Sequence, residues 1–262
     1  MPSECTPVIE IDGLTKRYGE ATAVEGLTTT VDAGTVYGFL GPNGAGKTTA
    51  MRMLTTLTRP TAGTARVDGH PIDDRAAVTP HIGYLPEEPP VYDELTGREQ
   101  LEYAAGLRDL PEPETGERIA ALLERFDLLE DADKRIEQYS KGMRQKIGVI
   151  QAVLHEPAVA FLDEPTSGLD PRAARTMRET IADLADREMT IFLSTHILPV
   201  ADDLADTVGV LHDGRLVAED APATLKRRAE TGDQRSLEDV FLEVTRETSD
   251  DGSTGESTRA SW

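Results

Sequence analysis

The fold of this chain is decided by the stretch Gly41-Pro42-Asn43-Gly44-Ala45-Gly46-Lys47-Thr48-Thr49. A β-like apolar run (36–40) leads into it, a helix-like run (48–57) leads out, and it matches the phosphate-binding pattern G-x-x-x-x-G-K-[ST]. Glycines let successive backbone N–H groups face an anion, and the following helix adds the positive end of its dipole. Lys47 can reach the β- and γ-phosphates, and the Thr48 hydroxyl can bind Mg²⁺. The stretch therefore predicts binding of a nucleoside triphosphate; the alternative is an ordinary Gly-rich turn before a helix.

A second element that carries chemistry is Phe161-Leu162-Asp163-Glu164-Pro165. The continuous apolar run 158–162 is typical of a buried parallel strand. Because the carboxyl ends of parallel strands meet at one edge of a sheet, Asp163 and Glu164 are expected beside the phosphate loop. Asp163 is expected to hold Mg²⁺ directly or through water, and Glu164 to polarise the water that attacks the γ-phosphate. Taken alone, the pair could also be an acidic turn after a strand.

The remaining sequence contains regions with mixed strand and helix patterns and one region with helix patterns alone. Strands are predicted over residues 8–14, 27–31, 64–67, 82–85, 158–162 and 190–193, a turn over 15–19, and a hairpin over 208–217. Helices are predicted over 171–186 and 236–245, and a disordered tail from 248. From 96 to 154 the pattern is helical, with one face formed by Leu101, Ala104, Ala105 and Leu107. We therefore expect a helical insertion of about 70 residues in an α/β domain.

The chain is strongly acidic, with 27 Lys and Arg against 48 Asp and Glu, a net charge of −21 and an isoelectric point near 4.6. This balance argues against nucleic-acid binding, because phosphate contacts need a basic surface. Arginine outnumbers lysine 21 to 6, and an acidic, lysine-poor surface suits a salt-rich cytoplasm in which cations screen the repulsion. The composition favours a halophile; a mildly acidic mesophile with a GC-rich genome is the alternative.

The cysteine count and the apolar runs bear on the compartment. Cys5 is the one cysteine, so an intrachain disulfide is excluded and a reducing compartment fits. No run reaches the roughly 18 apolar residues of a membrane-spanning helix, and the N-terminus has no signal-peptide pattern. We expect a cytoplasmic protein whose link to a membrane goes through a partner.

Four further stretches accompany the phosphate loop and the acidic pair. They are Ile82-Gly83-Tyr84-Leu85-Pro86-Glu87, Tyr139-Ser140-Lys141-Gly142-Met143-Arg144-Gln145, Ser167-Gly168-Leu169-Asp170 and Ser194-Thr195-His196. Lys47 and Asp163 lie 116 positions apart, a gap that the helical insertion fills. With these motifs, the chain from Val8 to about Thr245 resembles the ATP-binding cassette (ABC) ATPases.

The resemblance implies an α/β fold: a P-loop NTPase core of the ABC ATPase type with an antiparallel β subdomain and an inserted α-helical subdomain. It places a single ATPase domain at residues 1–247. The nucleotide-binding core is expected at about 7–86 and 157–220, the helical insertion at about 87–156, and a C-terminal extension at 221–247. Residues 248–262 are the expected disordered tail.

The resemblance also implies roles for single residues near the nucleotide. Tyr18 stands where the family has an aromatic residue that stacks on adenine; a Tyr packed at a strand end is the alternative. Glu87 stands where the family usually has a Gln that contacts Mg²⁺ and the attacking water, and a carboxylate still offers oxygen to the metal. His196 matches the switch histidine, which contacts the γ-phosphate and holds the water and Glu164 in line.

The stretch 139–145 aligns with the family signature, usually Leu-Ser-Gly-Gly-Gln. Ser140 and Gly142 match it, whereas Lys141 and Met143 depart from it. In the family this signature binds the nucleotide held by the opposite subunit, and the loop 167–170 crosses the interface between the two. The resemblance therefore implies a homodimer that binds ATP and Mg²⁺.

Within the family, three features are similar to the multidrug and polysaccharide export subfamily: the signature, Glu87, and Leu237-Glu238-Asp239-Val240-Phe241-Leu242. The similarity implies an ATP-hydrolysing subunit that powers a separate permease of about six helices and lies on the inner face of the membrane. One alternative is a soluble ABC ATPase acting on DNA or ribosomes, a class that usually carries two cassettes, coiled coils, zinc cysteines or basic arms. The other is a phosphate-loop kinase, which would need a lid and an acceptor site.

Overall fold

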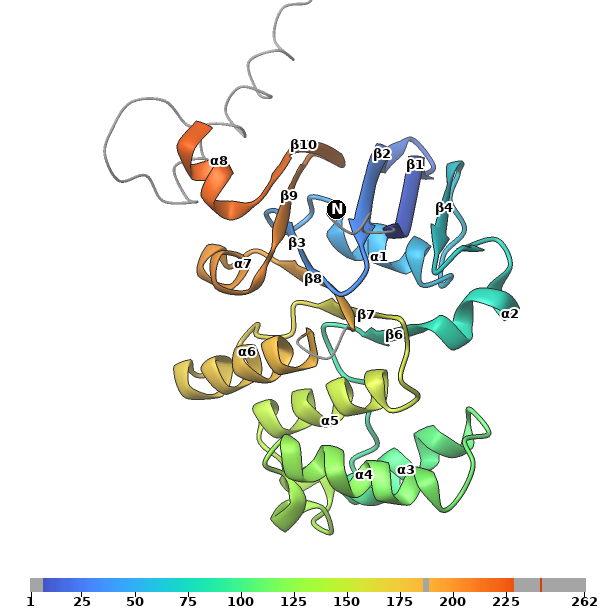
Figure 1. The fold of residues 1–262 in the computed structure, drawn as a ribbon, viewed down its shortest axis with the longest axis vertical. Helices are drawn as coiled ribbons and strands as arrows, with labels where there is room; N and C mark the ends of the chain where they lie inside the picture. The colour runs from blue at the N-terminus through green and yellow to red at the C-terminus, as the bar shows by residue number, and fades with distance from the viewer. Residues whose placement is uncertain (1–6, 186–188, 229–240, 242–262) are drawn as a thin grey trace, which may run out of the picture.

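The computed structural model describes residues 7–185, 189–228 and Phe241. Its strands form two sheets in the upper part of the molecule, and a layer of helices lies below them (Figure 1). Cys5, the tail predicted from 248 and, apart from Phe241, the helix predicted over 236–245 lie outside the described residues. No helix in the described ranges has the length and apolar character needed to cross a bilayer.

Six strands form the larger sheet, in the order β10-β9-β3-β8-β7-β6. Their bounds are β3 Val36–Leu40, β6 Ile82–Leu85, β7 Val159–Asp163, β8 Thr190–Thr195, β9 Thr207–His212 and β10 Arg215–Asp220. The strands from β9 to β6 are parallel, and β10 returns antiparallel to β9 in the predicted hairpin. Every residue of β3, β7 and β8 is buried, as expected for apolar strands covered on both faces. The carboxyl ends of β3 and β7 therefore lie at the same edge, with β8 between them.

The smaller sheet is antiparallel, in the order β2-β1-β4-β5. Its strands are β1 Pro7–Tyr18, β2 Ala21–Asp32, β4 Ala62–Val67 and β5 His70–Pro71. The turn predicted over 15–19 is wrong, because β1 continues to Tyr18 and pairs Arg17 with Thr22. Gly13, with φ +61, and several register shifts bend the strand without ending its ladder. These irregularities break the alternation from which the strand end was predicted.

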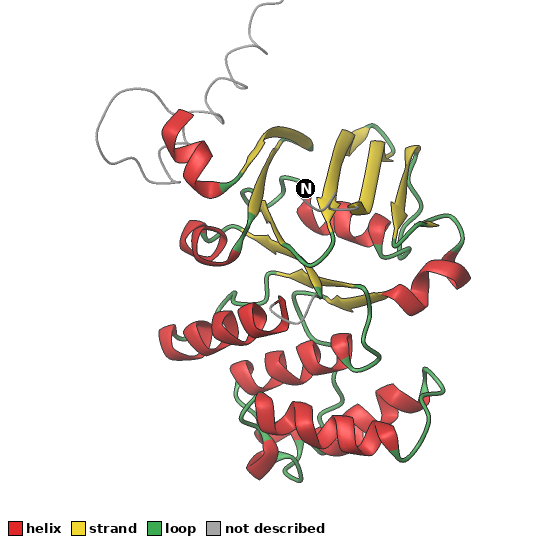
Figure 2. Ribbon diagram, in the orientation of Figure 1, coloured by secondary structure: helices red, strands yellow, loops and turns green. Residues whose placement is uncertain are grey.

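The helices lie on both sides of the parallel sheet, some in the lower layer and the others beside the strands above it (Figure 2). They are α1 Lys47–Leu54, α2 Arg75–Val78, α3 Gly97–Gly106, α4 Glu114–Arg125, α5 Lys141–Val153, α6 Pro171–Ala185, α7 Leu198–Leu204 and α8 Pro222–Arg228. A capping box of Thr96 and Glu99 starts α3, and the Ser140 hydroxyl caps α5. The prediction that Leu107 lies on the buried face of α3 is wrong, because the helix ends at Gly106 and Leu107 is 69% exposed.

Apolar side chains pack on both faces of the parallel sheet. On one face, Leu162 and Leu193 join a cluster with the helices of the lower layer. On the other face, Phe39, Phe161 and Phe192 pack with α1 and the antiparallel sheet. The ring centroid of Phe192 lies 5.3 Å from that of Phe39 and 5.4 Å from that of Phe161. Each such buried side chain contributes roughly 1.5–3 kcal/mol, so both faces hold the strand ends in place.

The antiparallel sheet touches the phosphate loop and the β9–β10 hairpin through Ala23 in β2. The Ala23 carbonyl oxygen lies 2.3 Å from the position of a Cβ at Gly46 and 2.9 Å from that of a Cβ at Gly214. The Gly214 N–H donates to Ala45 O at 3.0 Å, and Gly214 O accepts from Glu25 N–H at 2.8 Å. Backbone contacts therefore join three segments that are far apart in the sequence.

Candidate functional site

The stretch 41–49 forms a tight loop between β3 and α1. Gly44 and Gly46 have φ values of +85° and +106°, in the region that favours glycine. A Cβ at Gly41 would lie 2.5 Å from Leu211 O, so this position also has no room for a side chain. The glycines thus let the loop pack closely ahead of α1, whose N-terminus favours an anion.

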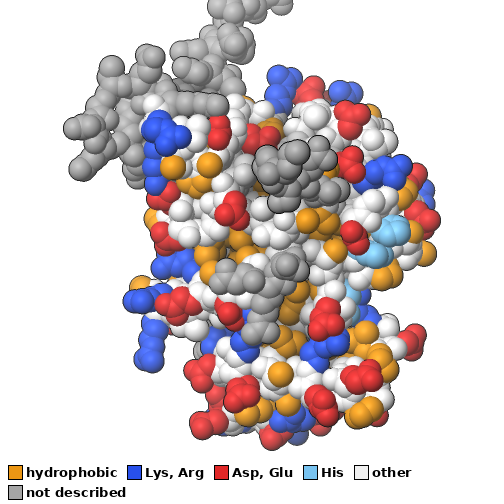
Figure 3. All heavy atoms as spheres, viewed as in Figure 1, with side chains coloured by type: hydrophobic (Ala, Val, Ile, Leu, Met, Phe, Trp, Pro, Cys, Tyr) orange, Lys and Arg blue, Asp and Glu red, His pale blue; other side chains and the backbone are white. Residues whose placement is uncertain are grey.

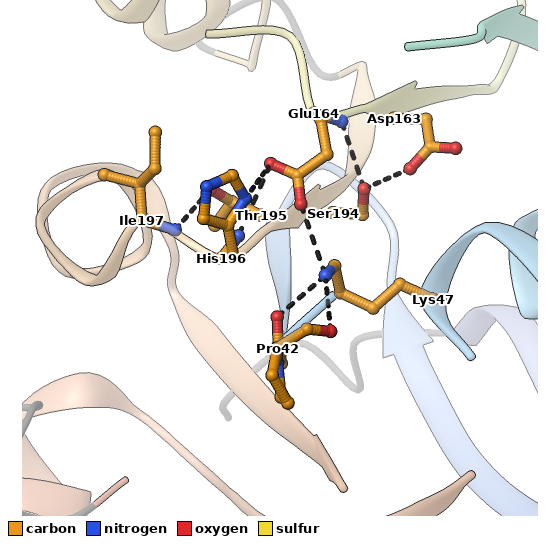
Figure 4. Close-up of polar contacts among 9 residues, drawn as sticks. Pro42, Lys47, Asp163, Glu164, Ser194, Thr195, His196 and Ile197 are labelled. Atoms are coloured by element: carbon orange, nitrogen blue, oxygen red, sulfur yellow. Dashed lines mark hydrogen bonds and ion pairs between the residues drawn. The ribbon is translucent and has the colours of Figure 1, made fainter. Parts of the chain in front are cut away.

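Lys47 begins α1 and is almost completely buried, at 5% exposed. Its Nζ donates to Gly41 O at 2.7 Å and to Pro42 O at 3.2 Å. It also lies 3.2 Å from Glu164 Oε1, and Figure 4 shows the ammonium between the loop carbonyls and this carboxylate. A buried ammonium needs such partners. The structure therefore brings the predicted phosphate-binding lysine and the predicted catalytic carboxylate into direct contact.

Glu164 follows the last residue of β7 and is 6% exposed. Its Oε2 lies 2.9 Å from His196 Nδ1 and also accepts from the His196 backbone N–H at 3.4 Å. Its φ of 50° is left-handed, a conformation that non-glycine residues adopt rarely and often at functional sites. Glu164 is thus fixed from two sides, by Lys47 and by His196 (Figure 4).

Asp163 is the last residue of β7 and is fully buried. Ser194, in the neighbouring strand β8, donates its hydroxyl hydrogen to Asp163 Oδ1 and accepts from the Glu164 N–H at 3.1 Å. The Ser194 carbonyl also accepts from this N–H, at 3.2 Å. One serine thus orients both members of the acidic pair, because β7 and β8 are adjacent. Ser194 precedes the predicted switch histidine by two residues, and no sequence pattern indicates its role beside the acidic pair.

A cavity of about 280 Å³ opens over the phosphate loop. Its lining combines loop residues with two predicted site residues from other elements: Ala23, Asn43, Gly44, Gly46, Lys47, Thr48, Thr49, Glu87 and Glu164. Glu87 lies two residues beyond the end of β6, which is adjacent to β7. The sheet order therefore brings Glu87 and Glu164 to one cavity, although 77 positions separate them.

The oxygen atoms around this cavity fit a hard divalent cation. Thr48 and Glu87 line the cavity, and the buried Asp163 Oδ2 has no hydrogen-bond partner among the described residues. Mg²⁺ prefers oxygen ligands and is usually bound by one or two protein groups together with phosphates and water. The described residues contain no cluster of three or more His, Cys, Asp or Glu side chains that could hold a metal ion by themselves.

Tyr18 lies at the end of β1 and is 50% exposed. The Lys16 ammonium lies 5.0 Å from its ring centroid and donates to Arg59 O at 2.7 Å. Tyr18 does not line the cavity over the phosphate loop. Its exposed ring is nevertheless accessible to a flat partner, which is what base stacking requires.

Ser140 and Gly142 lie at the start of α5 and do not line the cavity either. The Ser140 hydroxyl accepts from the Met143 N–H at 3.2 Å. A Cβ at Gly142 would lie 3.2 Å from the Ala173 side chain, so this helix start packs against the start of α6. The structure therefore separates the signature from the phosphate loop of the same chain.

The pKa of Tyr84, a residue beside the site, is raised above its usual value. Burial, with a smaller contribution from the Asp163 carboxylate, raises the pKa of Tyr84 to about 12. Tyr84 is in β6, next to β7, so its phenol stays neutral at physiological pH and adds no charge to the acidic pair.

Comparison with known families agrees with this arrangement. A family model described as "ABC transporter" matches residues 24–167, which is more than half of the chain. The chain belongs to the ABC transporter family. The match begins in β2 and ends just after the acidic pair, so it includes the phosphate loop, Glu87 and the signature of this ABC ATPase.

Individual relatives cover most of the chain. A daunorubicin resistance ATP-binding protein of Streptomyces coeruleorubidus is 44% identical over 228 residues, covering 87% of this chain and 72% of that protein. A bacitracin transport ATP-binding protein of Bacillus licheniformis is 40% identical over 223 residues, covering 84% and 72%. A solved ATP binding subunit of an ABC transporter matches with a TM-score of 0.81 and 33% identity, covering 91% of this chain and 99% of that one. These matches confirm the predicted ABC-type α/β fold and the ATPase class.

Proposed function

We propose that this ABC ATPase drives export through a separate membrane permease and works as a pair of identical copies. The proposal is supported by the two relatives named for daunorubicin resistance and bacitracin transport. The permease would have about six membrane-spanning helices, and the ATPase would lie against its cytoplasmic side. The alternative of an ATPase acting on DNA or ribosomes gains no support from these relatives.

The observation that carries the proposed chemistry is the position of Glu164 between Lys47 and His196 at the edge of the cavity. Glu164 would take the proton from the attacking water, and His196 would keep the accepting carboxylate in one orientation. Lys47 would exchange its pairing with Glu164 for contacts to the phosphates. Bound Mg²⁺, held by Thr48, Asp163 and Glu87, would neutralise phosphate charge.

The proposed dimer rests on the resemblance to the ABC ATPases, in which the signature binds the nucleotide held by the opposite subunit. Ser140 and Gly142 do not line the cavity of their own chain, which supports this arrangement, and they would contact the nucleotide bound by the other copy. Tyr18 would stack on adenine. The insertion, proposed at 87–156 between core segments at 7–86 and 157–220, would receive a cytoplasmic helix of the permease together with the loop after Glu87.

The test starts from the gene beside the one for this chain, which we expect to encode a membrane protein. Both proteins are co-expressed, membranes are washed, and the ATPase is followed in the membrane and soluble fractions with and without ATP. We expect it to co-purify with a protein of about six apolar spans. Glu164→Gln should remain membrane-bound but not turn over. An ATPase that instead fractionates with DNA or ribosomes would refute the transport proposal.

We further propose that the protein works in a salt-rich cytoplasm. Acidic side chains are spread over the face shown in Figure 3 rather than gathered in one patch, and the net charge is −21. Dissolved cations would screen the repulsion between these charges. ATPase activity and melting temperature should therefore rise with KCl to molar concentrations. An optimum at low salt would contradict this proposal.

A further inference from the structure

The segment that joins β6 to α3 carries Glu87 into the nucleotide cavity. Pro86, Pro89 and Pro90 fall within this segment, and each proline fixes its own φ near −65°. The segment therefore has few ways to bend, and the position of Glu87 depends on where the residues after it are attached.

The part of the segment three to five residues after Glu87 is attached to Gln100 in α3. Gln100 is 1% exposed. Its side-chain carbonyl accepts from the Tyr92 N–H at 3.0 Å, and its amide donates to Pro90 O at 3.4 Å. The same amide donates to Gln151 Oε1 in α5 at 3.0 Å. A buried amide with both ends satisfied holds its partners firmly, because breaking one bond leaves an unsatisfied polar group.

The start of the segment, on either side of Glu87, packs against α5. A Cβ at Gly148 would lie 2.9 Å from Pro89 Cβ and 2.5 Å from Leu85 Cδ1. The segment therefore lies directly on the backbone of α5, the helix that begins at Ser140. Contacts from both α3 and α5 fix the chain within five residues of Glu87.

We propose that Gln100 is a positioning residue that holds Glu87 in the nucleotide cavity from the helical insertion. Gln100 does not line the cavity, so it acts through the segment and not on the nucleotide. Its amide sets where Pro90 and Tyr92 lie. Because the prolines restrict the backbone between these residues and Glu87, the position of Glu87 is set as well. The inference rests on the proposed role of the cavity in ATP hydrolysis.

The test compares Gln100→Leu with Gln138→Leu in the full-length chain. The two substitutions are identical, but Gln138 is exposed at the end of a short 3-10 helix. ATP affinity is measured with a fluorescent ATP analogue, turnover by phosphate release, folding by melting temperature, and exchange of the Tyr92 amide by hydrogen–deuterium exchange.

Gln100→Leu should lower kcat on the order of tenfold to a hundredfold, the scale of a small misplacement of a reacting group. ATP affinity should change less than about twofold, because Lys47 and its loop are untouched. The Tyr92 amide should exchange faster. Gln138→Leu should change none of these. An unchanged kcat, or parallel losses of kcat and ATP affinity, would overturn the proposal.

A double-mutant cycle with Glu87→Ala tests the route of action. If Gln100 acts through Glu87, adding Gln100→Leu to Glu87→Ala should lower kcat no further. If the fold loss of kcat in the double variant equals the product of the two single losses, Gln100 acts independently of Glu87, and the inference is overturned. The exchange measurement does not need hydrolysis. A wild-type chain without ATPase activity would refute the proposed function, whereas unchanged Tyr92 exchange in Gln100→Leu would refute the role of Gln100.

Discussion

Replacing Glu164 by Gln should separate ATP binding from ATP hydrolysis. Loss of the general base should lower kcat by about a hundredfold or more. In the structure the Lys47 and Glu164 side chains are both 6% exposed and form an ion pair at 3.2 Å. Gln removes this charge while Lys47 keeps the Gly41 and Pro42 carbonyls, so phosphate no longer competes with a carboxylate for the ammonium. ATP affinity should therefore stay constant or rise by up to about tenfold, which is about 1.4 kcal/mol.

The same substitution should affect stability in a way that ATP reverses. Removing one partner of a buried ion pair costs about 3–5 kcal/mol, and the two remaining carbonyl acceptors reduce this to about 1–3 kcal/mol. The melting temperature should fall without ATP and recover with it. Turnover is measured by phosphate release and affinity with a fluorescent ATP analogue, with the exposed Glu130→Gln as control. Unchanged turnover, or lost ATP binding in a folded variant, would refute the reasoning.

Three further changes follow from the structure. Gly46→Ala should abolish ATP binding in equilibrium titrations, because its Cβ would lie 2.3 Å from Ala23 O at a φ of +106°; retained affinity would contradict this. Phe192→Ala should lower the free energy of unfolding in urea by about 3–5 kcal/mol; a loss below about 1 kcal/mol would count against the packing described. Burial lowers the pKa of His155 to about 4, so the unfolded chain takes up this proton first as pH falls. Stability should therefore fall between pH 6.5 and 4, and His155→Gln should reduce that slope in denaturation midpoints measured against pH.

The parts of the fold that the sequence predicted are those with local patterns. The spacing of the glycines predicts the phosphate loop, and the continuous apolar run before Asp163 predicts β7. Both patterns span only a few neighbouring residues, so both elements could be located from the sequence. The end of β1 at Tyr18 could not, because bulges break the alternation on which that inference depends. Leu107 fits the apolar period of α3 but follows the residue at which the helix ends.

The parts of the site that needed the structure depend on contacts between distant segments. Ser194 orients Asp163 only because β8 lies beside β7, and the sheet order is not encoded in either strand. Gln100 holds the segment after Glu87 through atoms of Pro90, Tyr92 and Gln151. A single glutamine in a helical pattern carries no signal for such a role.

The contact of Ala23 with both Gly46 and Gly214 has a consequence for protein engineering. The tip of the β9–β10 hairpin looks like a permissive place for an epitope tag, a split site or a new chain terminus, because it is a short turn between two strands. Yet its Gly214 N–H is bonded to Ala45 O, and its carbonyl accepts from Glu25 N–H. An insertion there would displace Gly214 and so disturb its hydrogen bond to Ala45 in the phosphate loop. A tag placed at this turn would therefore change nucleotide affinity without touching the nucleotide.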